Sequence, residues 1–274
     1  MHAKIRPYLT GLSFWIGLGL LLTANQTHFW GIFWGAVLAF VGYTGILFDT
    51  NTSRKMVLVF IPAAFAALIF PTLSDDIYRF YWDGHCILNG INPFAYTPQQ
   101  LMELHAFPWM NQFPNLNSPE YFSVYPSVNQ ALFAISALFG GGIRVFSMVY
   151  GILFLLGYSL LFSGLQKPVW KKCRWIIVAN PLLLVEGLGN FHAEILVVAG
   201  IVWAINFWNQ GRDFWAFFTF FITIAIKLIP ALFVPILLIQ FWRNKAFWGA
   251  GILGLIIVFI PWWNGTYFLN FLSS

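Results

Sequence analysis

Residues 56–84 read MVLVFIPAAFAALIFPTLSDDIYRFYWDG, an apolar run that ends in three carboxylates and an arginine. The whole chain of 274 residues is 59% hydrophobic and only 8% charged. A soluble domain carries about 25% charged residues, so this composition excludes a water-soluble fold. Acids gathered directly after an apolar run are therefore expected at a membrane surface.

Apolar runs that could cross or partly cross the ~30 Å hydrocarbon core recur along the chain. Several are shorter than a standard span, and Pro181 interrupts one of them. Such segments are tolerated when they are buried against other helices or line a wet cavity. We therefore predict an all-α fold, a polytopic transmembrane helix bundle that forms a single domain over residues 1–274. The predicted spans are residues 8–24, 29–48, 56–71, 143–163, 175–188, 193–208, 214–226, 228–242 and 246–260.

Lysines and arginines lie in short segments between these runs and predict the cytoplasmic ends. Alternation then places a long loop, about residues 72–125, and the turn at residues 186–194 on the external side. This holds only if residues 126–140 do not fully cross, so we predict that segment to be re-entrant or interfacial. Because basic loops report orientation, the net charge of +5 does not indicate a nucleic-acid partner. The orienting residues are Lys4, Arg6, Arg54, Lys55, Lys167, Lys171, Lys172, Arg174, Arg212, Arg243 and Lys245.

The start of the external loop has helical periodicity. Apolar side chains recur at helical spacing through residues 77–88, which predicts a juxtamembrane amphipathic helix. Ser74 is expected to cap its start and Gly90 to end it.

The charges of this helix have a structural and a functional interpretation. Asp75 and Asp76 would meet the positive end of the helix dipole, and Arg79 would pair with Asp75 or Asp83. The functional interpretation gains weight because Asp76, Arg79 and Asp83 share one face and a second polar group of residues is predicted on the same membrane side.

That second group is EGLGNFHAE at residues 186–194. A histidine at such a position is more often structural, and Lys227, which interrupts an apolar run, is most simply a snorkelling side chain. Several polar neighbours at a span end make His192 a candidate for phosphate or hydroxyl contact, and Lys227 a candidate for an anionic headgroup. The neighbours are Glu186, Asn190 and Glu194.

Together these motifs resemble the bacterial mannosyltransferase-like enzymes of the C-type (GT-C) membrane glycosyltransferases. The resemblance covers residues 72–235. It rests on DDIYRFYWDG at 75–84, GINPF at 90–94, the Tyr-Pro pair at 125–126, the Asn-Pro pair at 180–181 and the later Gly-Asn-x-His-x-acid element. It implies a polyprenyl-phosphate sugar donor and maps the catalytic base to Asp75 or Asp76. The later element ends in Glu194, which makes that match looser.

The implied reaction moves a monosaccharide, mannose above others, to an acceptor hydroxyl on the external face with inversion. A carboxylate must take the acceptor proton, and donors or cations must stabilise the departing phosphate. We assign the base to Asp76, with Asp75 about 100° away on the helix as an orienting or binding group. Phosphate candidates are Arg79, His192 and Lys227. The other binding candidates are Tyr78, Trp82, Asp83, Asn92, Tyr125, Glu186, Asn190 and Glu194.

The partners expected are the lipid-linked donor, a lipid or glycan acceptor and the membrane. The setting expected is the bacterial cytoplasmic membrane with the site facing outward. We expect no cofactor and assign no metal ligand, although a divalent metal requirement stays open. Related enzymes generally continue into more spans, which raises the expectation of a C-terminally incomplete chain. The alternatives are a multi-span lipid or solute transporter, which would show repeats and mid-span charges, and a non-catalytic envelope scaffold.

Overall fold

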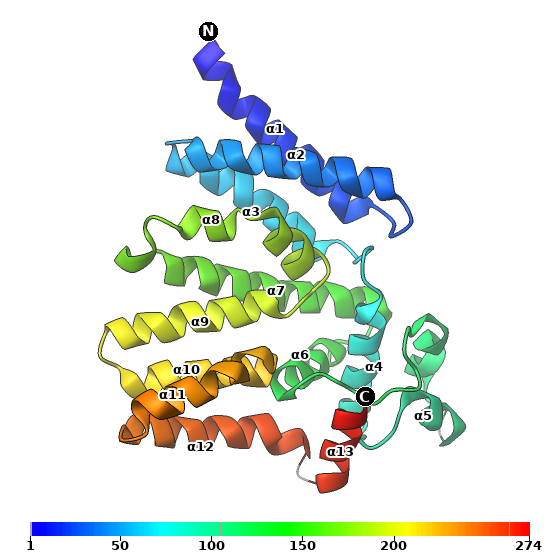
Figure 1. The fold of residues 1–274 in the computed structure, drawn as a ribbon. Helices are drawn as coiled ribbons and strands as arrows, with labels where there is room; N and C mark the ends of the chain where they lie inside the picture. Colours follow the sequence, from blue (N-terminus) through cyan, green and yellow to red (C-terminus); the bar gives the residue numbers. More distant parts are fainter. Residues whose placement is uncertain (1, 105, 263) are drawn as a thin grey trace. The chain divides into compact units, whose positions relative to one another are not determined.

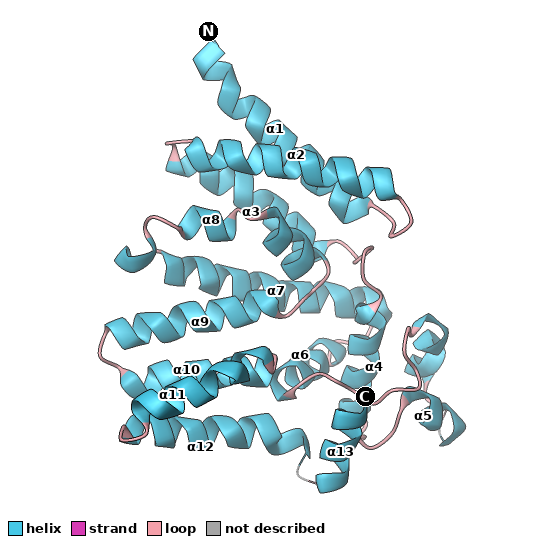
Figure 2. Cartoon of the chain, viewed as in Figure 1, coloured by secondary structure: helices cyan, strands magenta, loops and turns pink. Residues whose placement is uncertain are grey.

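The computed structural model describes residues 2–104, 106–262 and 264–274. Within these residues every regular element is a helix and no strand occurs (Figure 2). The predicted all-α fold is therefore confirmed.

The helices follow one another with short connections (Figure 1). The α-helices are α1 (His2–Thr23), α2 (Phe29–Phe48), α3 (Thr52–Leu68), α4 (Asp76–Leu88), α5 (Pro98–Leu104), α6 (Ser127–Ala137), α7 (Gly142–Leu165), α8 (Arg174–Val178), α9 (Glu194–Asn209), α10 (Asp213–Ile226), α11 (Val234–Phe241), α12 (Lys245–Phe259) and α13 (Gly265–Ser273). The 3₁₀-helices are η1 (Pro108–Asn115), η2 (Pro168–Trp170), η4 (Ile229–Phe233) and η5 (Ile260–Trp262). The element η3 (Leu183–Gly189) is a π-helix.

Three helical stretches are long and apolar enough to cross a membrane: Phe29–Phe48, Gly142–Leu165 and Lys245–Trp262. A fourth is added if η3 and α9, which meet at a bend of 110°, form one broken span. Apolar helices of 10–17 residues accompany them. The chain is thus a polytopic, integral membrane helix bundle, as its composition predicts.

The predicted span over residues 175–188 is broken, as Pro181 inside it indicates. α8 stops at Val178, and the chain resumes helical structure at Pro181. Proline lacks the N–H that continues a helix and disfavours helical backbone at the residue before it. The second half of the segment is the π-helix η3, which turns sharply into α9.

Residues 126–140 contain the 11-residue helix α6. At 1.5 Å per residue such a helix rises about 16 Å, roughly half of the hydrocarbon core. The length agrees with a re-entrant or interfacial segment, whose position in the membrane stays a prediction.

The chain divides into two compact units, which are described separately. The first comprises Met1–Ser74 and Gly151–Ile195, and the second Asp75–Tyr150 and Leu196–Ser274. One boundary lies between α3 and α4, and the other two fall inside α7 and α9.

Close backbone contact between α1 and α2 builds the first unit. A Cβ on Gly17 would lie 2.2 Å from the Ala39 backbone nitrogen, and a Cβ on Gly42 would lie 2.3 Å from that of Phe14. Small residues of this kind let membrane helices approach closely and gain van der Waals contact.

The two ends of the first unit differ in chemistry. At one end, the Lys55 ammonium donates to the Leu47 carbonyl oxygen (3.1 Å) and lies 5.6 Å from the Trp175 ring, which Arg174 also covers. Two of the predicted cytoplasmic basic clusters therefore lie together.

At the other end, Leu22 joins the start of the loop predicted to be external to the later polar turn. Its carbonyl oxygen accepts from the Thr72 hydroxyl (3.0 Å), and its side chain is what a Cβ on Gly189 would meet at 2.4 Å. α3, of 17 residues and about 25 Å, runs from the basic end to this one.

In the second unit, α4 packs directly on α6. The Phe80 and Phe133 rings stack with centroids 4.6 Å apart, and a Cβ on Gly84 would lie 2.5 Å from the Phe133 carbonyl oxygen. The Asn129 amide then donates to the carbonyl oxygen of Ile226 (2.9 Å), which ties α6 to the end of α10. α10 packs on α12 through Phe221 and Phe247.

Replacing Gly84 by alanine is expected to destabilise the protein by about 1–3 kcal/mol, because the added methyl group forces α4 away from α6. The measurement is the thermal unfolding midpoint in detergent, followed by tryptophan fluorescence. Gly19→Ala is the control, since no atom lies within 4 Å of a Cβ there and alanine favours the helix. Equal midpoints for the two variants would contradict the close contact of α4 with α6.

Candidate active site

The N-cap of α4 lies one residue later in the sequence than predicted. Asp75 is the N-cap, because its carbonyl oxygen accepts the first bond, from the Tyr78 amide at 3.1 Å. The prediction that Ser74 caps the helix is therefore wrong. At the other end Gly90 follows the C-cap Asn89 with φ +72°, which confirms it as the terminating glycine. The Asp75 side chain is exposed.

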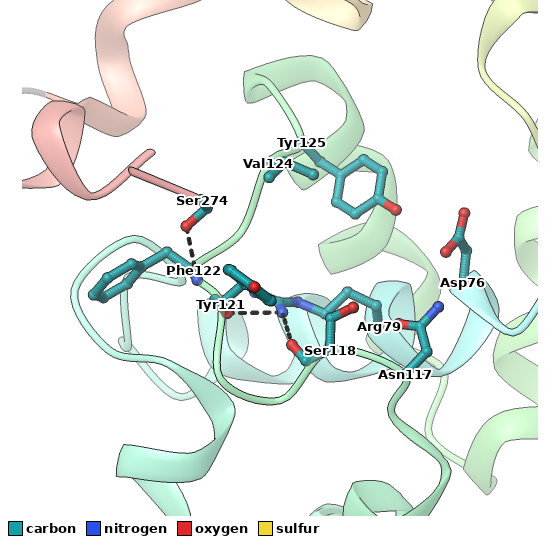
Figure 3. A pocket seen from close by; sticks show the side chains of 9 residues that line it. All are labelled: Asp76, Arg79, Asn117, Ser118, Tyr121, Phe122, Val124, Tyr125 and Ser274. Carbon is teal, nitrogen blue, oxygen red and sulfur yellow. Dashed lines mark hydrogen bonds between the residues drawn. The ribbon is translucent and has the colours of Figure 1, made fainter. Parts of the chain in front are cut away.

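Asp76 faces a cavity of about 320 Å³ in the second unit (Figure 3). One wall is α4, and the other is the segment that leads into α6. Asp76 is half-buried, as suits a carboxylate that meets both protein and solvent. The residues that line the cavity are Asp76, Arg79, Asn117, Ser118, Tyr121, Phe122, Val124, Tyr125 and Ser274.

Tyr125 and Asp76 both line the cavity, and the Tyr125 hydroxyl group is turned toward the Asp76 side chain (Figure 3). Burial, with the negative charges of Asp76 and Asp83, raises the pKa of the Tyr125 phenol well above its ordinary value. The hydroxyl group therefore stays protonated and is available as a hydrogen-bond donor in the cavity.

Arg79 forms a buried ion pair with Asp83 on the same helix. Arg79 Nε lies 2.9 Å from Asp83 Oδ1, and the two side chains are 9% and 1% exposed. The guanidinium also donates from Nη1 to the carbonyl oxygens of Tyr121 (3.0 Å) and Ser118 (3.4 Å). One side chain thus holds both α4 and the cavity's second wall.

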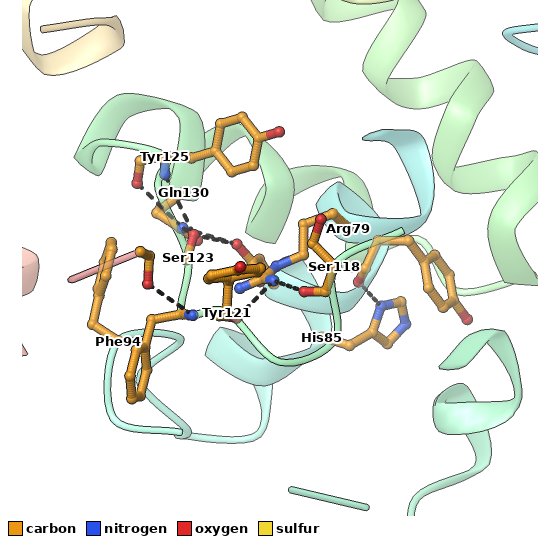
Figure 4. Close-up of polar contacts among 12 residues, drawn as sticks. Arg79, His85, Phe94, Ser118, Tyr121, Ser123, Tyr125 and Gln130 are labelled. Carbon is orange, nitrogen blue, oxygen red and sulfur yellow. Dashed lines mark hydrogen bonds and ion pairs between the residues drawn. The ribbon is translucent and has the colours of Figure 1, made fainter. Parts of the chain in front are cut away.

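The other oxygen of Asp83 completes this network (Figure 4). Asp83 Oδ2 accepts from the Ser123 hydroxyl and from Gln130 Nε2 (3.1 Å). Gln130 Nε2 also contacts Ser123 Oγ (2.7 Å) and the Tyr125 carbonyl oxygen (3.3 Å). The carboxylate of Asp83 is thereby satisfied inside the protein, and the backbone of Tyr125 is fixed.

The predicted residues divide by location. Asp76, Arg79 and Tyr125 line the cavity, while Asp83 and Trp82 are 1% exposed and do not line it. Trp82 packs edge-on against Trp109, with ring centroids 4.9 Å apart.

Three more predicted residues of this unit do not line the cavity. Asn92 donates to the Pro261 carbonyl oxygen at 2.9 Å, and Lys227 caps the end of α10. Tyr78 is half-buried on α4.

The later polar turn forms a compact cluster in the first unit. Glu186 Oε2 lies 3.2 Å from both His192 Nδ1 and Asn190 Nδ2. The backbone supports it, because the His192 amide donates to the Glu186 carbonyl oxygen (2.9 Å) and Phe191 adopts φ +58°. A bulky residue at positive φ is uncommon and signals a constrained bend. Glu194 is exposed at the start of α9.

The Asp76 cavity and the Glu186–His192 cluster belong to different units, so their convergence stays a prediction. Among the described residues no group of three or more His, Cys, Asp or Glu side chains could hold a metal ion. Reasoning from the sequence missed Ser123, Gln130 and the carbonyl groups that bind Arg79. Gln130 carried a signal, since it is a polar residue within the apolar segment 126–140.

The fold and this cavity define a class of protein. It is a polytopic membrane protein in which a carboxylate, on a helix that follows an apolar helix, lines a cavity. A family model described as alpha-(1→6)-mannopyranosyltransferase, N-terminal domain, matches residues 2–243. The chain belongs to this family, and the resemblance found in the motifs is confirmed.

Two curated relatives are each named alpha-(1→6)-mannopyranosyltransferase A. The one from Mycobacterium tuberculosis is 24% identical over 187 residues, which are 62% of this chain and 33% of that protein. The one from Corynebacterium glutamicum is 22% identical over 155 residues, which are 53% of this chain and 29% of that protein. The chain thus spans about a third of the length of these relatives. No solved structure matches it significantly.

Asp83→Asn is expected to destabilise the protein by about 3 kcal/mol or more, since it leaves the Arg79 charge buried without a counter-charge. Asp75→Asn, at an exposed N-cap, should change stability by less than about 1 kcal/mol. Unfolding midpoints in detergent measure both. Identical midpoints for Asp83→Asn and the unaltered protein would show that the ion pair does not hold the loop.

Proposed function

We propose that this chain forms the catalytic part of a membrane mannosyltransferase, and that Asp76 is its general base. The donor is a polyprenyl-phosphate mannose, the acceptor is a hydroxyl group of a lipid or glycan, and transfer takes place on the external face. The observation that carries the proposal is the half-buried Asp76 carboxylate, which lines a cavity at the start of α4 together with the Tyr125 side chain.

The reaction requires one proton transfer and one displacement. The acceptor oxygen attacks the anomeric carbon as its proton passes to Asp76, and the bond from that carbon to the phosphate oxygen breaks. The polyprenyl phosphate leaves with the bonding electron pair. A single displacement of this kind inverts the anomeric carbon. General-base catalysis of this type contributes about 10²–10⁴-fold.

The phosphate needs positive charge or hydrogen-bond donors as it departs. Arg79 lines the cavity, but Asp83 already balances its charge at 2.9 Å, which leaves Arg79 mainly to hold the site together. The other two phosphate candidates are His192, which is itself paired with Glu186, and Lys227.

Placement on one membrane face is supported within the first unit. Leu22 contacts both Thr72, four residues before Asp76 in the sequence, and the position of Gly189. This end is opposite to the one that carries Lys55 and Arg174. By the positive-inside rule, the acidic loop and the polar turn face outward from the bacterial cytoplasmic membrane.

Asp76→Asn is expected to lower mannosyl transfer by at least about 10²-fold, because the amide cannot accept the acceptor proton. The measurement is transfer of radiolabelled mannose from polyprenyl-phosphate mannose in membranes that contain the protein. Glu103→Gln, an exposed acid of the same loop that does not line the cavity, serves as the control. Full activity in both Asp76→Asn and Asp75→Asn would refute the assignment.

Tyr125→Phe is expected to lower the turnover number by about tenfold while the unfolding midpoint changes by little. The substitution removes the hydroxyl donor that we propose orients Asp76, an interaction worth about 0.5–1.5 kcal/mol, and keeps the aromatic contact with Phe80. Steady-state kinetics with the same donor measure it. Unchanged turnover would exclude an orienting role for Tyr125.

A transporter is the second candidate, because the 110° bend between η3 and α9 is the kind of helix break that transporters use. In that case labelled lipid or solute would cross proteoliposome membranes without any glycosidic product. Product formation that depends on Asp76 would decide for the transferase.

A further inference from the structure

The wall of the Asp76 cavity that faces α4 carries an accessible amide group. Asn117 lines this cavity and is exposed, and its side chain forms no hydrogen bond with the described residues. Two other exposed asparagines lie just before it, in η1, and neither lines the cavity. Both are already engaged, because Asn111 Oδ1 accepts from Gln112 Nε2 and Asn115 Nδ2 donates to Gln112 Oε1, each at 3.1 Å. Asn117 is therefore the amide of this segment that a ligand in the cavity can use.

The backbone on both sides of Asn117 is anchored. Leu116 before it is only 9% exposed. Ser118 after it accepts from Arg79 Nη1 through its carbonyl oxygen (3.4 Å), and Arg79 is itself paired with Asp83. A binding group on a fixed backbone loses little conformational freedom when a ligand binds, which favours affinity.

The amide group of Asn117 is turned toward the side of the cavity on which Asp76 lies (Figure 3). The two residues come from different walls, Asp76 from α4 and Asn117 from the segment that leads into α6. The Tyr121 side chain, 46% exposed, adds aromatic surface to the same cavity. A ligand in this space can therefore meet a carboxylate, an amide and an aromatic ring together.

The chemistry of the lining limits the ligand. Arg79 is the cation among the lining residues, and Asp83 already balances its charge, so Asp76 leaves the cavity net negative. A phosphate would be repelled there. An amide offers two N–H donors and one oxygen that accepts, which suits a hydroxyl group because a hydroxyl group both donates and accepts. The volume of about 320 Å³ lies at the low end of the range for small-ligand sites and suits a single sugar ring.

We propose that Asn117 binds the acceptor substrate, holding a second hydroxyl group of the ring whose reacting hydroxyl group gives its proton to Asp76. This inference rests on the transferase function proposed above and adds that the acceptor end is a neutral ring with at least two hydroxyl groups. Asn117 then determines specificity, because a site that hydrogen-bonds a substrate hydroxyl group selects against analogues that lack it.

The first test is equilibrium binding of methyl α-D-mannopyranoside to the full chain in detergent, measured by saturation-transfer NMR without any donor. Saturable binding is expected. Asn117→Ala should weaken it roughly threefold to tenfold, as expected for one lost hydrogen bond. The unfolding midpoint should stay the same, since the side chain forms no internal bond. Asn115→Ala is the matched control, because it removes an exposed amide two positions earlier that lies outside the cavity, and it should leave binding unchanged.

The second test uses the monodeoxy analogues of the same glycoside, each lacking one ring hydroxyl group. One analogue should bind the unaltered protein as weakly as the parent glycoside binds Asn117→Ala. The variant should not distinguish that analogue from the parent, because both changes remove the same hydrogen bond and contacting groups are not additive. Mannose 1-phosphate, the probe for the donor sugar, should bind more weakly than the neutral glycoside because Asp76 repels its charge.

The proposal is overturned by absence of saturable binding, by equal affinity in Asn117→Ala and the unaltered protein, or by an equal loss in Asn115→Ala. It is also overturned if every analogue loses as much affinity in the variant as the parent does, or if mannose 1-phosphate binds more tightly, which would place the donor sugar here. Binding that depends on Asn117 without any mannosyl transfer would count against the transferase assignment alone. Transfer that depends on Asp76, with binding insensitive to Asn117→Ala, would overturn this proposal alone.

Discussion

The buried ion pair between Arg79 and Asp83 is the interaction on which the site depends. A charge taken out of water is costly unless it is paired and hydrogen-bonded on all sides. Asp83 meets that requirement with Arg79, Ser123 and Gln130, and Arg79 meets it with two backbone carbonyl groups. These partners come from α4, from the loop that precedes α6, and from α6 itself. Pairing the two charges therefore fixes three segments at once.

The same network fixes the segment that lies beside Asp76. Gln130 holds the backbone of Tyr125, and the Tyr125 side chain lines the same cavity as Asp76. The charged motif DDIYRFYWDG therefore contains two kinds of residue. Asp75 and Asp76 lie toward solvent, whereas Arg79, Trp82, Asp83 and Gly84 are buried and build the surface that carries them. The two kinds of residue differ in exposure because one face of α4 is packed on α6.

Some of this is readable from sequence alone. A chain with 8% charged residues has too little polar surface for water and must fold in a membrane. The membrane class, the helical fold and most helix positions therefore follow from composition and apolar runs. The periodicity of residues 77–88 gives α4, and Gly90 ends it as expected. The family motif singles out Asp76 and the Glu186–His192 turn as candidate site residues. Within that turn, the Glu186 carboxylate does contact both Asn190 and His192.

Other features required the tertiary structure. The partners of Asp83 depend on contacts between segments distant in sequence, since Ser123 and Gln130 lie 40 and 47 positions after it. A sequence states which side chains carry charge, but whether a charge meets solvent or a buried partner depends on packing. Local propensity and hydropathy thus determined a membrane helix bundle with acids at its edge. Packing of α6 and the loop against α4 decided which acid faces the cavity and which one holds it together.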